Sequence, residues 1–501
     1  MAIAPATVGP MTEEVVEGIP FGRRISELAE EDPDAKALII VAPDGSERVF
    51  TTSQIDRRTN QLARAFAGEG VALGDRVAIE LQNSPELVLG LLAAWKIGAA
   101  PVPMRWDLPD WERQRLLEVV DAKLVVDDGS LPRLLKAADD VSDEPLPDVV
   151  GPYHNGICSS GSTGFPKVIL AVRPQLYDEM TSVPFLAAWG EEVERPQRIL
   201  VPAPLYHTNG FATMLSYLGG DHLVILEKFD AELVVDLIER HRITNFTATP
   251  TMLQRIANVP NIDERDLSSL RWVLQGAAVI APSLVLRWCD IVGPDSFVMA
   301  YGMTEGLGLT ALRGSEWLTR QGSVGRGFRE TDIQIRDPEG NILPPREIGE
   351  IYMRSPTTGQ YDYLGGAALL PTTEDGFGTA GDMGWLDEEG YLYIVDRRVD
   401  MIISGGANVF PAEVESALAD HPAIADVVVI GLKDDEWGRR VHAVIEPRDH
   451  SAPPSAADVI AYAKQRLAPY KVPKTVEIVD AIPRSAATKV NRSALIAERG
   501  G

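Results

Sequence analysis

Strand-like and helix-like segments alternate along the chain between about residue 36 and about residue 330. Residues 75–81 (DRVAIEL) have the apolar, β-branched character of a buried strand, and residues 84–98 (SPELVLGLLAAWKIG) follow as a helix with Ser84 as N-cap and Pro85 at its first position. The alternation continues further along the chain. Strands are predicted at residues 198–205, 222–229, 244–250 and 269–278, and a helix at residues 231–243. Such alternation is typical of mostly parallel sheets that are covered by helices.

The pattern changes between Gly325 and Leu392, where short alternating pieces are separated by Gly, Pro, Asp and Asn turns. Residues 332–337 (DIQIRD) and 349–355 (GEIYMRS) are examples, and they predict an antiparallel β-barrel or sandwich portion. After Asp400 the remaining residues alternate helix and strand patterns over roughly a hundred residues, which is a usual size for a separate domain.

The predicted fold class is therefore α/β. A large N-terminal region contains two helix-covered, mostly parallel sheets and a β-barrel portion, and a small α+β domain follows it. We place the two domains at residues 1–397 and 398–501.

Charge and cysteine content exclude several classes of function. The chain has 47 Lys plus Arg against 73 Asp plus Glu, a net charge of -26, so its field repels nucleic acid and anionic membranes. Cys158 and Cys289, its 2 cysteines, cannot form a disulfide scaffold or a cysteine zinc site. The N-terminus lacks a signal-peptide pattern, and Glu86, Lys96 and prolines interrupt the most apolar window. We expect a cytoplasmic protein with no stable membrane insertion.

Residues 159–170 (SSGSTGFPKVIL) form a loop of hydroxyl residues, glycines and one lysine between two apolar runs. Exposed backbone N–H groups, short hydroxyls and an ammonium suit a polyphosphate. The loop is not a Walker A motif, because Lys167 precedes Val168 rather than Ser or Thr, and it lacks the G-x-G-x-x-G spacing of kinases. By itself it fits a flexible connection as well.

The loop resembles the phosphate-binding loop of the adenylate-forming superfamily, which includes acyl-CoA synthetases, peptide-synthetase adenylation domains and beetle luciferase. The resemblance runs from about Phe21 to the C-terminus, and several more motifs of this family follow in its order. These are residues 203–211 (APLYHTNGF), 275–279 (QGAAV), 301–305 (YGMTE), 349–355, 379–415 and 483–492 (PRSAATKVNR). An ordered set of this kind is a far stronger signal than any single motif.

The resemblance implies an ATP-dependent acid–CoA ligase, an enzyme that forms a carbon–sulfur bond. Such a ligase joins a carboxylate to the α-phosphate of ATP with release of pyrophosphate, and then transfers the acyl group to coenzyme A, giving acyl-CoA and AMP. The implied cofactors are ATP, Mg²⁺ and coenzyme A. The protein must hold two anions in line and neutralise developing charge.

The nucleotide-binding residues that the resemblance implies fall into two groups. Donors to the β- and γ-phosphates are Ser159, Ser160, Gly161, Ser162, Thr163, Gly164 and Lys167. Residues around the α-phosphate, adenine and ribose are Gly276, Ala277, Ala278, Tyr301, Gly302, Met303, Thr304, Asp382, Ile394 and Arg397. Glu305 is the implied Mg²⁺ ligand, since Mg²⁺ is usually held by few protein carboxylates and several phosphate oxygens.

Catalysis is implied for Thr163, Glu305 and Lys489, with Lys489 bridging the substrate carboxylate and the α-phosphate as charge shifts between them. The residue before this lysine is Thr488, where the family usually has glycine. A β-branched residue resists a positive φ, so we expect the lysine loop to sit differently from the usual one.

The acid and coenzyme A sites are also implied by the resemblance. Tyr206, His207, Gly302 and Met303 line the acid pocket, where His207 acts as a gate. The C-terminal domain is mobile and rotates about a hinge near Val399. Gly405, Gly406 and Asn408 then line the channel for coenzyme A.

The acid and the acceptor are less constrained than the reaction. Residues 101–112 (PVPMRWDLPDWE) and 401–415 resemble bacterial ligases for bile acids and related polycyclic or terpenoid acids. Small residues along the expected pocket strands are compatible with a bulky apolar acid and equally with a medium-chain fatty or aryl acid; they include Ala277, Ala278, Gly302, Gly306 and Gly308. Alternatives are an adenylation enzyme that loads a carrier protein, a variant that performs one half-reaction, and a non-catalytic nucleotide binder. A homodimer is also compatible with the resemblance.

Overall fold

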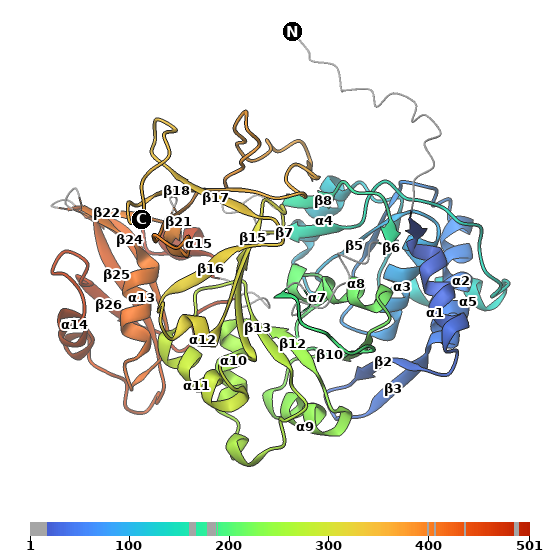
Figure 1. Cartoon of the computed structure of the whole chain (residues 1–501), viewed down its shortest axis with the longest axis horizontal. Coiled ribbons are helices and arrows are strands. Elements are labelled where there is room, and N and C mark those ends of the chain that lie inside the picture. Colours follow the sequence, from blue (N-terminus) through green and yellow to red (C-terminus); the bar gives the residue numbers. More distant parts are fainter. Residues whose placement is uncertain are drawn as a thin grey trace, which may run out of the picture.

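The computed structural model describes residues 18–159, 167–177, 187, 189–397, 400–404, 407–434, 437–484 and 490–500. Within them, a thirteen-stranded sheet runs through the molecule (Figure 1). Its parallel part consists, in spatial order, of β14 (Phe297–Gly302), β13 (Trp272–Gln275), β12 (Asn245–Ala248), β10 (Arg198–Val201), β11 (His222–Leu226) and β2 (Lys36–Val41). The predicted mostly parallel sheet with helices is confirmed.

Antiparallel strands extend this sheet at both ends. β3 (Glu47–Thr51) pairs with β2 at one edge. At the other end lie β15 (Leu309–Arg313), β16 (Ser323–Phe328), β21 (Leu392–Arg397), β20 (Asp382–Leu386), β18 (Gly349–Arg354) and β17 (Asp332–Arg336). The antiparallel portion expected after Gly325 thus continues the main sheet.

Three smaller sheets complete the N-terminal region of the described chain. A parallel sheet contains β4 (Arg76–Ile79), β5 (Ala100–Pro103) and β6 (Leu124–Val126); an antiparallel sheet contains β7 (Gly156–Ser159), β8 (Lys167–Ala171) and β19 (Tyr361–Leu364); and β1 (Ile19–Pro20) pairs with β9 (Leu176–Tyr177). β19 is distant in sequence from β8 but pairs with it, and β8 flanks the expected phosphate loop.

Alternate residues of the parallel strands face two different hydrophobic cores. Leu38 and Ile40 of β2 pack in the core with α1 (Phe21–Glu31), α2 (Thr52–Gly68), α3 (Pro85–Lys96) and α8 (Thr213–Leu218). Ile39 and Val41 pack in the core with α9 (Ala231–His241), α10 (Pro250–Ala257) and α11 (Pro282–Val292). This follows from the two-residue period of a strand. Further helical segments of the described N-terminal region are α4 (Asp110–Val120), α5 (Leu131–Asp139), α7 (Thr208–Phe211), α12 (Gly314–Trp317) and the 3₁₀ turn η2 (Ile262–Glu264).

The beginning of α3 matches its sequence prediction. Ser84 is the N-cap, and its side chain accepts a 3.1 Å hydrogen bond from the Leu87 backbone N–H. Pro85 occupies the first turn, where its missing N–H leaves no helical bond unmade.

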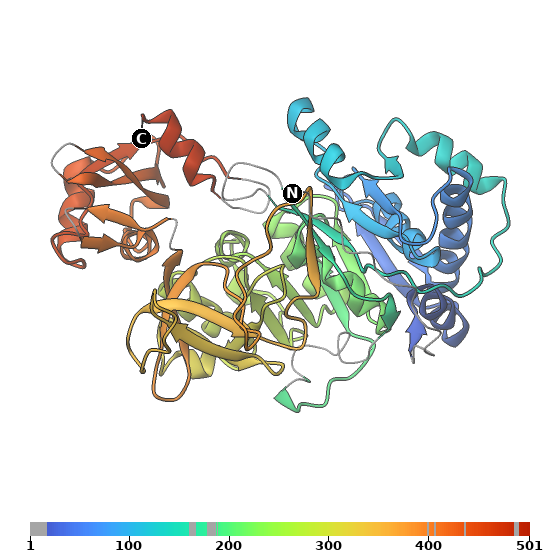
Figure 2. The ribbon, with the colours of Figure 1, turned by 90° about the horizontal axis from the view of Figure 1, so that it is seen from above.

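The C-terminal residues form a unit with cores of its own, seen at the left of Figure 2. Its elements are β22 (Ile402–Ser404), β23 (Ala407–Val409), α13 (Pro411–Ala419), β24 (Ile424–Asp434), β25 (Gly438–Pro447), α14 (Ala456–Lys464), β26 (Thr475–Ile478) and α15 (Arg492–Glu498). Ser283 Oγ of α11 donates a 2.7 Å hydrogen bond to Asp420 Oδ1 after α13. The domain boundary at residues 397 and 398 stays a prediction.

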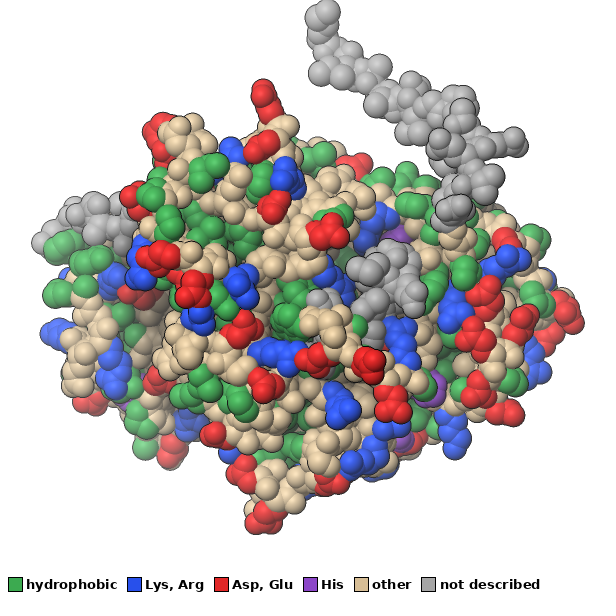
Figure 3. All heavy atoms as spheres, viewed as in Figure 1, with side chains coloured by type: hydrophobic (Ala, Val, Ile, Leu, Met, Phe, Trp, Pro, Cys, Tyr) green, Lys and Arg blue, Asp and Glu red, His purple; other side chains and the backbone are tan. Residues whose placement is uncertain are grey.

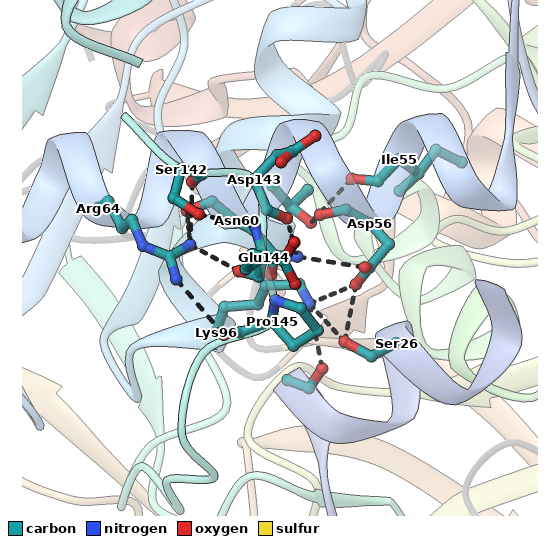
Figure 4. Close-up of polar contacts among 12 residues, drawn as sticks. Ser26, Ile55, Asp56, Asn60, Arg64, Lys96, Ser142, Asp143, Glu144 and Pro145 are labelled. Carbon is teal, nitrogen blue, oxygen red and sulfur yellow. Dashed lines mark hydrogen bonds and ion pairs between the residues drawn. The ribbon is translucent and has the colours of Figure 1, made fainter. Parts of the chain in front are cut away.

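A buried polar cluster ties α1, α2 and α3 together (Figure 4). Lys96 Nζ lies 2.6 Å from Asp56 Oδ1 and 2.9 Å from Ser26 Oγ, and the lysine side chain is 2% exposed. Asn60 donates to Asp56 Oδ2 and to the Asp143 carbonyl oxygen, which adds the segment after α5 to the cluster. Burial lowers the pKa of Lys96, and the Asp56 carboxylate opposes that shift.

The visible face in Figure 3 carries acidic and basic side chains interspersed with apolar ones. None of the described helices has both the length and the apolar character that crossing a bilayer requires.

Candidate active site

The expected site residues follow strands that end at one edge of the parallel sheet. Gly276 follows β13, Met303 follows the adjacent β14, and Tyr206 comes after β10, which is one strand beyond β12. Because parallel neighbours end on the same side, these loops converge at the carboxyl edge, where ligands bind in open α/β sheets.

The turn after β13 is held in a strained conformation and leaves space beside Gly276. Ala277 has φ 76, a left-handed value that costs energy for a residue with a Cβ. Gln275 Nε2 fixes the turn by donating a 2.6 Å bond to the Ala278 carbonyl oxygen. A Cβ built on Gly276 would have no atom within 4 Å, so a planar ligand can approach this backbone closely.

Tyr301 and Asp382 are joined directly. Tyr301 Oη donates a 2.6 Å hydrogen bond to Asp382 Oδ2, and Asp382 is 6% exposed. Asp382 lies opposite Arg397 in the β20–β21 ladder. Tyr301 and Ile394 also pack against the same hydrophobic core. The expected adenine and ribose residues therefore meet, although the Arg397 side chain lies outside the described atoms.

Glu305 is bonded to a residue that the motifs did not indicate. Tyr363 Oη donates a 2.6 Å hydrogen bond to Glu305 Oε1, and Lys167 Nζ lies 4.8 Å from the centroid of the same tyrosine ring. Burial and the neighbouring Glu305 raise the pKa of Tyr363, so its phenol remains a donor. The sequence signal for Tyr363 was only an aromatic residue in a short strand after the GEIYMRS motif.

Thr304 is linked to the segment of the expected acid-pocket residues through Thr208, the first residue of α7. The two hydroxyl oxygens, Thr208 Oγ1 and Thr304 Oγ1, lie 2.7 Å apart. Tyr206 and His207 pack with ring centroids 4.6 Å apart. Burial raises the pKa of Tyr206 to about 12, so this side chain is a neutral phenol. Sequence reasoning missed Thr208, which immediately follows His207.

Small residues near the site do not all provide room. A Cβ on Gly308 would lie 2.6 Å from Thr331 Cγ2, and one on Gly302 would lie 3.0 Å from Leu309 Cδ1. Neighbouring protein atoms therefore fill the space that these glycines leave, unlike the space at Gly276. Gly302 and Gly308 therefore add no room for a bulky acid.

Several expected residues lie outside the described part of the chain. They are Ser160, Gly161, Ser162, Thr163, Gly164, Val399, Gly405, Gly406, Thr488 and Lys489, together with the side chains of Ser159 and Asn408. The described strands that flank the phosphate loop pair so that Ser159 lies opposite Lys167. The loop ends are therefore adjacent.

The donor set suits a magnesium ion that arrives with a nucleotide. Among the described residues, no group of three or more His, Cys, Asp or Glu could hold a metal ion by itself. Glu305 offers one carboxylate, and its Oε2 has no hydrogen-bond partner among these residues. Mg²⁺ bound by one carboxylate, phosphate oxygens and water fits this arrangement.

Two family profiles match this chain. The profile described as AMP-binding enzyme matches residues 25–153 and 157–361, and the profile described as AMP-binding enzyme C-terminal domain matches residues 413–489.

Relatives of known activity are similar over most of the chain. A feruloyl-CoA synthase of Amycolatopsis sp is 33% identical over 461 residues, which cover 88% of this chain and 92% of that protein. A long-chain-fatty-acid–CoA ligase of Mycobacterium tuberculosis is 31% identical over 478 residues, covering 89% of this chain and 92% of that protein.

A solved structure is similar over nearly the whole chain. It is o-succinylbenzoate CoA synthetase of Bacillus subtilis in complex with its acyl-adenylate intermediate, with a TM-score of 0.80, 28% identity, and coverage of 94% of this chain and 97% of that chain. The same enzyme has been solved with ATP and a magnesium ion, with a TM-score of 0.79 to this chain.

Proposed function

Because the chain belongs to the AMP-binding enzyme family and is an ATP-dependent acid–CoA ligase, we propose that its own substrate is a hydrophobic carboxylic acid. The ligase forms an acyl-adenylate with release of pyrophosphate and then an acyl-CoA with release of AMP. The Tyr301–Asp382 hydrogen bond, together with the position of Glu305 just after the carboxyl end of β14, supports the assignment of the site.

In the first half-reaction the protein positions two anions and offsets their charge. The Tyr301 ring and the open backbone at Gly276 would hold adenine, and Asp382 would accept bonds from the ribose hydroxyls. Glu305 would hold Mg²⁺, which supplies Lewis-acid stabilisation of the phosphates. Lys167 would add a positive charge beside them.

Thr304 and Lys489 are proposed to act at the reacting atoms. The Thr304 hydroxyl, held by Thr208, would donate to the α-phosphate. Lys489 would neutralise charge that moves between the acid and the phosphate. The attacking carboxylate is ionised near neutral pH, so no general base is required.

For the second half-reaction we propose that the chain works as two domains, residues 1–397 and 398–501. Rotation of the smaller domain near Val399 would withdraw Lys489 and bring Gly405, Gly406 and Asn408 to the site. A glycine-lined channel suits the narrow path of a thiol.

A hydrophobic acid is supported by the buried phenol of Tyr206 and by the packing of Met303 against the apolar core beside Tyr301. The feruloyl and long-chain fatty acyl relatives also act on acids with large apolar parts. Within the class of hydrophobic acids, we propose more specifically that the substrate is a fused-ring steroid or terpenoid acid.

A panel of acids tests the proposed substrate class. Purified protein would be incubated with ATP, Mg²⁺ and coenzyme A plus cholate, abietate, decanoate, ferulate, acetate or malonate, and AMP and acyl-CoA would be quantified by chromatography. We expect kcat/KM to be highest for a large apolar acid, and for cholate or abietate on the finer prediction. A preference for acetate or malonate would overturn the hydrophobic assignment.

A homodimer and a cytoplasmic location remain proposals. Light scattering during size-exclusion chromatography and fractionation of cells that make the protein would test them.

A further inference from the structure

Tyr363 lies at a junction between distant parts of the chain. β19 pairs antiparallel with β8, and Tyr363 is opposite Ile169, two residues after Lys167. Gly365 follows β19 with φ +86, and a Cβ there would lie 3.1 Å from Val119 Cγ1 of α4. The tyrosine is 4% exposed and packs edge-on against Tyr361 with centroids 5.3 Å apart. Its ring therefore has a fixed position.

The segment before β19 also holds the backbone next to Glu305. Thr357 Oγ1 donates a 2.9 Å bond to the Gly306 carbonyl oxygen, and Thr358 Oγ1 donates a 2.9 Å bond to that of Leu307. Ser355 Oγ donates to the Gly306 carbonyl as well, at 3.2 Å. Residues 355–363 thus hold the Glu305 loop by its backbone and the Glu305 carboxylate through Tyr363.

Two opposite charges contact the same tyrosine without contacting each other. Glu305 Oε1 accepts from the hydroxyl, while the Lys167 ammonium lies over the ring face, where the negative quadrupole attracts a cation. Among the described residues, Glu305 and Lys167 form no ion pair with each other. A carboxylate and an ammonium this near the same ring would attract each other strongly if they were free to turn.

We propose that Tyr363 is a positioning residue that keeps Glu305 and Lys167 apart, so that Glu305 is free for Mg²⁺ and Lys167 for phosphate. The inference rests on the proposed function of this site. The hydroxyl fixes one carboxylate oxygen and leaves the other for the metal ion. The ring holds the ammonium on its face. Without the hydroxyl, Glu305 turns to Lys167, and the resulting ion pair competes with both ligands.

Tyr363→Phe tests this role because it removes the hydroxyl and keeps the ring. Tyr361→Phe is the matched control: Tyr361 lies on the same strand, and its hydroxyl accepts a 2.9 Å bond from the Leu370 N–H rather than contacting Glu305. Calorimetry would give the ATP affinity of each protein across a Mg²⁺ series without acid. Thermal melting would confirm that each variant is folded.

We expect Tyr363→Phe to raise the half-saturating Mg²⁺ concentration about tenfold, because Mg²⁺ must then compete with the Glu305–Lys167 ion pair, and Tyr361→Phe to leave it unchanged. The inference would be overturned if both variants raised the half-saturating Mg²⁺ concentration equally, or if Tyr363→Phe did not raise it. In either case, ATP binding by the wild-type protein would still support the proposed ligase. Failure of wild-type protein to bind Mg²⁺ and ATP would instead contradict the proposed function.

A second variant tests the separation of charge directly. In a Lys167→Gln background Glu305 has no ammonium to pair with, so adding Tyr363→Phe should move the half-saturating Mg²⁺ concentration by less than about threefold. A full tenfold shift in that background would show that the ring does not act by separating Glu305 from Lys167.

Discussion

Tyr301 Oη donates a 2.6 Å hydrogen bond to Asp382 Oδ2 across three intervening strands of the main sheet. Tyr301 belongs to β14, at the end of the parallel part, and Asp382 begins β20 in the antiparallel part. One bond therefore connects the proposed adenine and ribose sides of the site.

Tyr301→Phe removes this bond and leaves the buried Asp382 carboxylate with one donor fewer. We expect the KM for ATP to rise about fivefold, with kcat changed less than about twofold, because one of the contacts that orient Asp382 for the ribose is lost. Steady-state kinetics at saturating acid measures both constants. Tyr393→Phe, on β21, is the control, since Tyr393 stacks on Trp385 instead; an unchanged KM in Tyr301→Phe would count against the role of the bond.

Thr208→Val removes the hydroxyl that contacts Thr304. We expect adenylate formation to slow about fivefold, because the Thr304 hydroxyl loses the contact that orients it. Rapid-quench measurement of the first turnover reports this step. Thr213→Val is the control in the following helix α8, since the Thr213 hydroxyl donates to the Gly210 carbonyl at 2.6 Å. The role of Thr208 is wrong if both variants slow the step equally.

Lys96→Met tests the buried cluster of Figure 4. Removing the ammonium leaves Asp56 buried without its ionic partner, and we expect the free energy of unfolding to fall by about 3 to 5 kcal/mol. Urea denaturation measures the change. The double variant Lys96→Met/Asp56→Leu should recover part of the loss, because no unpaired charge remains. A double variant less stable than the single one would contradict this reading.

His154 predicts a specific dependence of stability on pH. Burial, with a smaller contribution from Arg173, lowers the pKa of His154 to about 3. The folded state keeps this imidazole neutral, whereas the unfolded chain takes up a proton below its ordinary value near 6.5. The contribution of neutral His154 to the free energy of unfolding is therefore fully present above about pH 6.5. It is lost progressively as the pH decreases from 6.5 towards 3, and the loss is at most about 5 kcal/mol.

His154→Gln should flatten that part of the stability curve. An amide can still donate to the Pro174 carbonyl oxygen, which His154 Nε2 contacts at 2.8 Å. Urea unfolding at a series of pH values between 4 and 7 measures the slope. An equally steep loss of stability in the variant would assign the acid sensitivity to other groups.

Lys489→Ala separates the two half-reactions. We expect it to abolish formation of the acyl-adenylate, because no other residue is proposed to neutralise the shifting charge there, and to spare conversion of a supplied adenylate to acyl-CoA. Mass spectrometry of each half-reaction checks both statements. Equal loss of both steps would remove the specific role of Lys489.

The sequence predicted the site where strand order alone brings residues together. Gly276 and Met303 follow adjacent parallel strands, so their proximity needs only the alternation of strands and helices. The capping of α3 by Ser84 was predictable for a similar reason, because the N-cap, the proline and the apolar run are local.

The contacts of Tyr363 and Thr208 were not predictable because they depend on tertiary pairing. β19 meets β8 across nearly two hundred residues of sequence, and no local pattern specifies that register. The antiparallel portion posed the same problem: a two-residue period fits a barrel, a sandwich or the extension of an existing sheet. The space beside a glycine also depends on its neighbours, as Gly276 and Gly308 show.

Detection of the acyl-adenylate decides whether this chain forms acyl-CoA in two steps. Protein at high concentration would be mixed with ATP, Mg²⁺ and the best acid of the panel, quenched after one turnover, and examined by mass spectrometry before and after addition of coenzyme A. We predict an acid-dependent adenylate that disappears as acyl-CoA and AMP form. Release of ADP, or acyl-CoA that forms with no adenylate at any time, would contradict the account.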